Sequence, residues 1–119
     1  MTFIGVDIVE IERVESAIKR GGERFLSRIY TETELRTCQD RLSSLASRFA
    51  AKEAVMKVLG TGGIGIAWRE IEILTDDDGS PSVKLYGQAL NKAAELNLKE
   101  VSVSLSDSKQ HAVAVAIGI

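Results

Sequence analysis

The spacing of hydrophobic residues along the chain alternates between strand-like and helix-like patterns. Residues 3–9 are apolar on both faces except at Asp7, which predicts a buried strand. Residues 42–59 contain no glycine or proline and are followed by Gly60, so they predict the longest helix and its end. The same criteria predict shorter helices at residues 10–20, 24–30, 32–41 and 88–97, and further strands at 68–75, 82–86, 100–106 and 112–117.

Short polar or glycine-rich segments separate these elements. Thr31 and Glu34 have the spacing of a capping box at the start of a helix. The sequence GTGGIG at residues 60–65 is too rich in glycine for regular structure, and DDDGSP at residues 76–81 predicts the turn of a hairpin. Because there is no repeat and no linker, we expect one α+β domain over residues 1–119, with a small, mostly antiparallel sheet packed on the long helix.

The last predicted strand has no polar face. Its bulky residues alternate with Ala112, Ala114 and Ala116, and the strand before it alternates bulky residues with serines. A face of small side chains permits the close approach of another surface. Two interpretations stay open at this point: a helix of the same chain packs on the alanines, or a second subunit does.

Composition limits the class of protein. Of the 119 residues, 45% are hydrophobic and 27% are charged, which are ordinary values for one globular core. No apolar run approaches the ~18 residues that span a bilayer, and the first residues lack the basic-then-apolar pattern of a secretory signal. The lone Cys38 excludes an internal disulfide, and with the single His111 it cannot form the usual zinc patterns. We therefore expect a cytoplasmic protein without membrane contact.

Charge argues against nucleic acid as a partner. Fifteen Lys and Arg residues against 17 Asp and Glu residues give a net charge of −2, which disfavours binding to DNA or RNA. Residues 13–28, however, contain five basic and two acidic residues, an excess of three positive charges. This segment is either the solvated face of a helix or a docking patch for an acidic protein.

Two acidic residues stand at positions where the pattern favours apolar or small side chains. Asp7 lies inside the first predicted strand, where a carboxylate costs free energy unless it is paired or binds a cation. Glu53 shares one stripe of the long helix with Lys57 and two alanines. Each residue also has a plainer interpretation, with Asp7 paired to an arginine or capping a helix, and Glu53 in a surface ion pair with Lys57.

Together these residues predict a phosphate-binding site with a divalent cation. Two carboxylates suit Mg²⁺, which takes few protein ligands and completes its shell with phosphates and water. Lys57 adds a positive charge one turn after Glu53, and the backbone N–H groups of residues 60–65 are able to bind an anion. This glycine-rich loop follows a helix rather than preceding one, so it is neither a P-loop nor a dinucleotide-binding fingerprint.

The order and spacing of these motifs resemble those of a known family. The segments concerned are 5–11 (GVDIVEI), 48–54 (RFAAKEA) with Lys57, 60–62 (GTG), 79–81 (GSP), Gly87 and 103–107 (VSLSD). They closely resemble holo-[acyl-carrier-protein] synthase, the small bacterial type of 4'-phosphopantetheinyl transferase, over nearly the whole chain. The resemblance implies the α+β fold of that family and a homotrimer with active sites between subunits.

The resemblance also implies an activity. Members of the family transfer 4'-phosphopantetheine from coenzyme A to a serine of apo acyl carrier protein for fatty acid biosynthesis, and they release 3',5'-ADP. By this resemblance Asp7 and Glu53 hold Mg²⁺, Lys57 lies beside the phosphate, and Arg48 lies near the 3'-phosphate of the nucleotide. The remaining coenzyme A contacts are expected at Gly60, Thr61, Gly62 and Asp107. The acidic carrier protein is expected to meet Arg13, Arg20 and Arg24.

From these roles we expect Glu53 to accept the proton of the carrier serine, directly or through water, and Lys57 to stabilise charge on the leaving ADP. At the position of Asp107 many family members have a histidine and others an aspartate. An ionised aspartate donates no hydrogen bond to phosphate. His111 is either a substitute donor or, as is commoner for a lone histidine near the start of a strand, a structural or solvated residue. The alternative to an enzyme is a non-catalytic trimeric adaptor that binds Mg²⁺ and nucleotide, and the intact Asp7, Glu53 and Lys57 argue against it.

Overall fold

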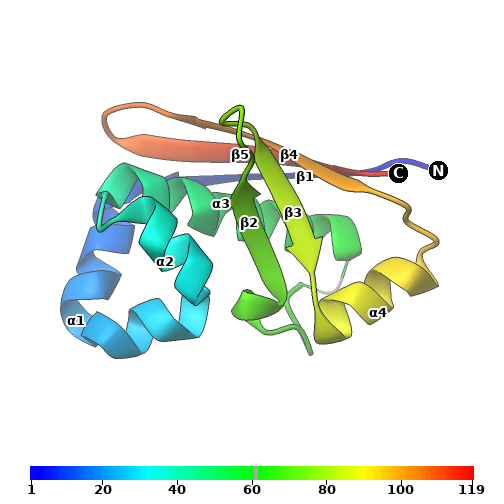
Figure 1. Cartoon of the computed structure of the whole chain (residues 1–119), viewed down its shortest axis with the longest axis horizontal. Coiled ribbons are helices and arrows are strands. Elements are labelled where there is room, and N and C mark those ends of the chain that lie inside the picture. Colours follow the sequence, from blue (N-terminus) through cyan, green and yellow to red (C-terminus); the bar gives the residue numbers. More distant parts are fainter. Residues whose placement is uncertain (61) are drawn as a thin grey trace.

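The computed structural model describes residues 1–60 and 62–119, which fold as the predicted mixture of helices and antiparallel strands (Figure 1). None of the described helices is long and apolar enough to cross a membrane. In chain order the elements are β1 (Phe3–Glu10), α1 (Ile11–Ile29), α2 (Glu32–Cys38), α3 (Leu42–Leu59), the 3-10 helix η1 (Trp68–Glu70), β2 (Ile71–Thr75), β3 (Pro81–Leu85), α4 (Gly87–Glu95), β4 (Val101–Asp107) and β5 (His111–Gly118).

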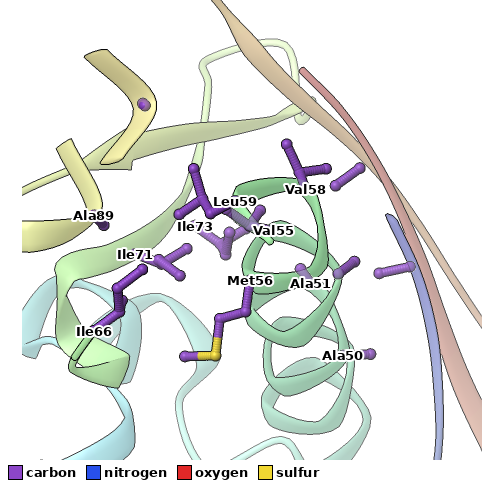
Figure 2. Close-up of a cluster of buried hydrophobic side chains, with 14 residues drawn as sticks. Ala50, Ala51, Val55, Met56, Val58, Leu59, Ile66, Ile71, Ile73 and Ala89 are labelled. Carbon is purple, nitrogen blue, oxygen red and sulfur yellow. The ribbon is translucent and has the colours of Figure 1, made fainter. Parts of the chain in front are cut away.

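Helix α3 lies at the centre of the fold. The sheet of β1, β5 and β4 covers one side of it, and the β2–β3 hairpin and α4 lie on another (Figure 1). Most α3 side chains are therefore buried, as expected for a helix without a continuous polar stripe. In Figure 2, Ala50, Ala51 and Val58 lie on the side facing the sheet, whereas Leu59 lies beside Ile73 of the hairpin. The prediction of a small antiparallel sheet on a long helix is confirmed.

The three-stranded sheet has the order β1–β5–β4 and is antiparallel throughout. Its inner face carries Ala112, Ala114 and Ala116, which are buried against α3. A helix of the same chain therefore covers the alanine face, as the first of the two interpretations expected. The outer face carries larger apolar side chains that stay exposed in the subunit. They are Ile4, Val6, Ile8, Val115 and Ile117.

Two predicted helix boundaries need comment. The predicted break after residue 20 is confirmed, because Gly22 has a non-helical backbone (φ 54°, ψ −136°) between the two halves of α1. The end of α2 was predicted wrongly. This helix ends at Cys38 rather than near Arg41, because Gln39 and Asp40 adopt left-handed conformations with φ of 48° and 61°.

The segment 68–75 was also predicted wrongly as one continuous strand. Residues 68–70 form η1, and β2 begins only at Ile71. The reason is a tertiary contact: the carbonyl groups of Trp68 and Ile71 accept hydrogen bonds from the ammonium group of Lys52 in α3. Periodicity within the segment carries no information about a lysine that lies far away in the chain.

A separate group of buried side chains fills the space between α1, α2 and α3. Cys38 is 0% exposed and packs there with Ile29, Tyr30 and Leu45. The Tyr30 hydroxyl donates a hydrogen bond of 2.6 Å to the Leu45 carbonyl, which satisfies its polar end. Burial raises the pKa of both the Cys38 thiol and the Tyr30 phenol, so both groups stay protonated at neutral pH.

Candidate functional site

Strand β1 lies very close to α3 at Gly5. A Cβ atom at this position would stand 2.1 Å from the carbonyl oxygen of Ala54, far inside van der Waals contact. Only glycine therefore allows the two backbones to approach this closely. Because Asp7 follows two residues later on the same face of β1, the contact brings its side chain against α3.

Two carboxyl groups and one ammonium group meet at this contact. Lys57 donates hydrogen bonds to Asp7 Oδ1 at 3.2 Å and to the carbonyl of Val6 at 2.7 Å. Glu53, one turn earlier on α3, is half-buried and lies close enough to Asp7 for the two carboxyl groups to interact. The Asp7 side chain is only 13% exposed. Its partner is thus a lysine from α3, rather than an arginine or a helix end, and Lys57 forms its ion pair with Asp7 across two elements.

The electrostatic balance of this cluster favours a bound cation. Burial raises the pKa of Glu53, the Asp7 carboxylate beside it raises it further, and Lys57 opposes both effects. Two ionised carboxylates against one ammonium leave a net negative charge, which a divalent ion relieves. The donors are hard oxygens and fit Mg²⁺. Within residues 1–60 and 62–119, no three His, Cys, Asp or Glu side chains gather as a metal site, so the remaining ligands would be phosphate and water oxygens.

Two pockets share Glu53 in their walls. We call the first the α1 pocket: it has a volume of ≈ 500 Å³ and joins the carboxylate pair to the basic helix. We call the second the glycine pocket: it has a volume of ≈ 340 Å³ and lies against the glycine-rich loop. The α1 pocket is lined mainly by Asp7, Glu53, Arg13, Phe25, Phe49 and His111. The glycine pocket is lined by Glu53, Met56, Lys57, Gly62, Gly63, Ile66 and Trp68. Glu53 therefore faces two different ligand-sized spaces, whereas Asp7 lines only the α1 pocket.

The glycine-rich loop has the backbone freedom that its sequence suggests. Gly60 ends α3 with φ of 75°, and Gly62 continues with φ of 62°, a conformation that side chains with a Cβ rarely adopt. Gly62 then lines the glycine pocket, next to Lys57. Thr61, which was also predicted to contact coenzyme A, lies outside the described residues.

Arg48 and Asp107 belong to a second group of residues, apart from the carboxylate pair. Arg48 is 9% exposed and donates a hydrogen bond of 2.7 Å to the Thr75 hydroxyl, while its buried Nε has no partner among the described residues. Ser47 donates to Asp107 Oδ2 at 3.3 Å. Since β4 and β1 are opposite edges of the sheet, Asp107 and Asp7 lie on strands about 10 Å apart. Among the described residues, the hydrogen bonds of Arg48 and Asp107 include none to Asp7, Glu53 or Lys57, although Arg48 lies on the same helix as Glu53.

The predicted carrier-binding residues lie along α1. Arg13, Arg20 and Arg24 are all exposed, and Arg13 also lines the α1 pocket beside the carboxylates. His111, at the start of β5, lines the same pocket and is exposed. It therefore faces the α1 pocket, and along β5 it is next to Ala112, the partner of Asp107 in the sheet.

Sequence reasoning missed several residues of these two groups. Phe49 and Trp68 stack with ring centroids 4.8 Å apart, each in the wall of one pocket. Ser47 and Thr75 bind the polar side chains of the second group. The sequence contained one usable signal, because Ser47 directly precedes Arg48 in the long helix. Thr75 has no such signal, because it reaches Arg48 only through the packing of β2 on α3.

Comparison with known proteins places the chain among relatives of one kind. The model of the 4'-phosphopantetheinyl transferase superfamily matches residues 3–116. A holo-[acyl-carrier-protein] synthase of Dehalococcoides mccartyi is 52% identical over 117 residues, which cover 98% of each chain. This similarity extends over all the site residues described above.

Solved structures show the same fold. The holo-[acyl-carrier-protein] synthase of Helicobacter pylori in complex with coenzyme A matches with a TM-score of 0.87 and 35% identity, covering 98% of this chain and 99% of that one. The acyl carrier protein synthase of Plasmodium yoelii with ADP bound matches with a TM-score of 0.86 and 30% identity, covering 98% and 93%.

Proposed function

Because the chain belongs to the 4'-phosphopantetheinyl transferase superfamily, we infer that it transfers 4'-phosphopantetheine from coenzyme A to a serine of apo acyl carrier protein. It is an enzyme of the holo-[acyl-carrier-protein] synthase type, and coenzyme A is its substrate. The second product is 3',5'-ADP. We take residues 1–119 as one catalytic domain and place the reaction in the cytoplasm, where fatty acid biosynthesis would use the product.

The observation that carries this proposal is the meeting of Asp7, Glu53 and Lys57 between β1 and α3. We propose that Asp7 and Glu53 hold Mg²⁺, which when bound neutralises charge on the coenzyme A pyrophosphate. Thr61 and Gly62 would offer backbone N–H groups to the same phosphates. The N–H of Gly60, also predicted to contact coenzyme A, is already bonded to the carbonyls of Met56 and Lys57 at the end of α3. The glycine pocket, which Lys57 and Gly62 line, is the space we assign to this part of the substrate.

The side chains of the chain then divide the work of the transfer. The carrier serine hydroxyl attacks the phosphorus that bears pantetheine, and the bond from this phosphorus to the bridging oxygen of the pyrophosphate breaks. Glu53 accepts the serine proton, directly or through water. Lys57 stabilises the negative charge on the departing 3',5'-ADP.

The acidic carrier protein is proposed to dock on α1. Arg13, Arg20 and Arg24 present positive charge beside the α1 pocket, which opens onto the carboxylates. Carrier docking there would bring its serine to Glu53 from the side opposite to the nucleotide. Charge complementarity of this kind mainly sets association rate and register.

We also propose a homotrimer with sites shared between subunits. The exposed outer face of the sheet supports it, since Ile4 is 68% exposed and Ile8 is 65% exposed in the single subunit. A contiguous apolar face of this kind is typical of an interface. The split site supports it as well: Arg48 and Asp107 would reach the nucleotide of a neighbouring subunit, where Arg48 would meet the 3'-phosphate.

The test is direct transfer to a carrier protein. The protein is incubated with coenzyme A, Mg²⁺ and apo acyl carrier protein, and the carrier is weighed by mass spectrometry. The expected result is a mass gain of one phosphopantetheine, which a carrier with its serine replaced does not show. Glu53→Gln is expected to lose most of the transfer while staying folded. No mass gain with a competent carrier would contradict the proposal and favour a nucleotide-binding adaptor.

A further inference from the structure

A buried ion pair, Lys52 with Glu34, lies beside the proposed site without belonging to it. Both side chains are 0% exposed, and Lys52 Nζ lies 2.8 Å from Glu34 Oε1. Burial lowers the pKa of Lys52, although the Glu34 carboxylate opposes this shift. Two charges taken out of water cost free energy that their attraction rarely repays in full. The pair is therefore a poor source of stability, and its other contacts need an explanation.

Every hydrogen-bonding group of the pair has a partner. The three N–H groups of Lys52 donate to Glu34 and to the carbonyls of Trp68 and Ile71. The oxygens of Glu34 accept in addition from the backbone N–H of Thr31 at 2.9 Å and of Ile73 at 2.9 Å. The pair thus binds backbone groups at the start of α2 and on both sides of the entry into β2.

The backbone that Lys52 holds is the return of the glycine-rich loop. The loop leaves α3 at Gly60 and comes back through Trp68, whose carbonyl is 3.2 Å from Lys52 Nζ. Trp68 is also a wall of the glycine pocket, together with Glu53 and Lys57. Its ring stacks on Phe49 of α3. Lys52 therefore fixes the far wall of the pocket relative to the helix that carries the two proposed site residues.

We propose that Lys52 is a positioning residue of the transfer reaction: with Glu34 as its counter-ion, it fixes Trp68 and so sets the shape of the glycine pocket for coenzyme A. The inference rests on the proposed function, since it assigns that pocket to coenzyme A. The hydrogen bonds from Lys52 to the carbonyls of Trp68 and Ile71 are directional, so they hold the end of the loop in one position. An apolar side chain of the same size would fill the space without fixing that position.

The main variant is the pair Lys52→Met with Glu34→Gln, because Lys52→Met alone leaves a buried charge and threatens folding. We expect the Kd and KM for coenzyme A to rise about tenfold or more, since a 1 Å displacement in a site has effects of that size or larger. The KM for the carrier protein is expected to stay within about twofold, because neither Lys52 nor Glu34 lines the α1 pocket. Val58→Ala, a buried truncation on the sheet side of α3, is the control for lost stability, and neither KM should change there.

Trp68 is the only tryptophan of the chain, so its emission reports the pocket wall without any catalysis. The double variant is expected to shift this emission and Val58→Ala is not. Glu34→Gln leaves the buried Lys52 ammonium without its counter-ion, so it is expected to lower stability. Where this variant folds, it keeps both bonds from Lys52 to the loop, and its Kd for coenzyme A is expected to stay near that of the unaltered protein. Unchanged emission with an unchanged Kd in the folded double variant, or an equal loss in Glu34→Gln, would overturn the inference. Failure of the unaltered protein to bind coenzyme A would instead refute the proposed function.

Discussion

Glu53 lies where its ionised carboxylate is electrostatically unfavourable, and a bound cation would remove this cost. It is half-buried, it lies next to the carboxylate of Asp7, and its nearest ammonium group is already paired with Asp7. The pKa of Glu53 is therefore raised above its ordinary value of 4.5 by burial and by Asp7. The same arrangement that suits a metal ligand or a base costs the metal-free protein some stability.

This cost gives a prediction for Glu53→Gln in metal-free protein. A raised pKa in the folded state means that the carboxyl group stabilises the fold while protonated and loses that contribution as the pH rises through its folded pKa. Glu53→Gln is therefore expected to melt higher than the unaltered protein at neutral pH, and the difference should vanish below pH 4.5. Thermal melts in EDTA across this pH range measure it. A lower melting temperature for the variant at pH 7 would contradict the assigned electrostatics.

Arg48 offers a second prediction at this scale. Its guanidinium is almost buried and donates a hydrogen bond to Thr75, and its Nε has no partner in the part of the chain that the structure describes. If Arg48 binds the 3'-phosphate, Arg48→Gln removes a charge-assisted hydrogen bond to coenzyme A. The binding of coenzyme A should then weaken by about 1.5–3 kcal/mol, which raises the KM roughly ten- to a hundredfold. The KM for 3'-dephospho-coenzyme A should barely change. An equal loss for both substrates would assign Arg48 to the fold and not to the phosphate.

At the scale of elements, the contact of β1 with α3 decides where the carboxylates meet. Gly5→Ala places a methyl group against the Ala54 carbonyl, so β1 must move away and carry Asp7 with it. We expect a loss of Mg²⁺ affinity and of transfer greater than the loss of stability explains. Mn²⁺ titration followed by electron paramagnetic resonance measures the affinity. Val103→Ala, in β4, is the control for lost stability and should keep the metal affinity of the unaltered protein. If Gly5→Ala also keeps this affinity, the contact of β1 with α3 does not position the carboxylates for the metal.

Helix α1 gives an electrostatic prediction. Reversing one charge by Arg13→Glu is expected to raise the KM for the acidic carrier protein and to flatten its dependence on salt, because rim charges act mainly on association. The KM for coenzyme A should not change. Arg36→Glu, an exposed charge reversal on α2, is the matched control. Steady-state kinetics over a salt series makes the comparison, and equal salt slopes for Arg13→Glu and the unaltered protein would exclude this face as the docking site.

The elements that the sequence predicts well are those whose signals are local. The end of α3 at Gly60 and the capping box at Thr31 follow from neighbouring residues, and both are confirmed. Segment 68–75 was misassigned because Lys52, far away in the chain, turns two of its carbonyls inward. The early end of α2 depends on left-handed residues without a glycine, and Gln39 gives no local sign of it.

At the scale of the whole molecule, Asp7 and Asp107 lie on opposite edge strands of one sheet, whereas Arg48, Glu53 and Lys57 lie on the helix that this sheet covers. The meeting of Asp7, Glu53 and Lys57 could be anticipated, because each residue breaks the pattern of its own element. The separation of Asp107 from Asp7 could not, since strand order is a property of the folded chain. A site shared between subunits would reunite them.

Subunit mixing tests this arrangement. Glu53→Gln and Arg48→Gln remove residues from different groups, so a mixed trimer contains some sites in which both groups are intact. Two weakly active proteins, unfolded together and refolded, are expected to regain activity that neither has alone. Mixtures no more active than their components would place each complete site within one subunit.

The exposed outer face of the sheet gives a separate test of the trimer. Val6→Lys places a charge on this face, and the variant is expected to be monomeric when its mass is measured by light scattering.

Because Cys38 is completely buried, its rate of chemical labelling reports local opening of the fold. Only the thiolate form of a cysteine reacts with a thiol reagent. In the folded protein the packing of α2 against its neighbours keeps the reagent away from Cys38, and burial raises the pKa of the thiol so that it stays protonated. Labelling must therefore wait for that region to open. Since the chain has a single cysteine, each labelled molecule has opened at this place at least once. The labelling rate therefore measures how often the region around Cys38 unfolds locally under native conditions.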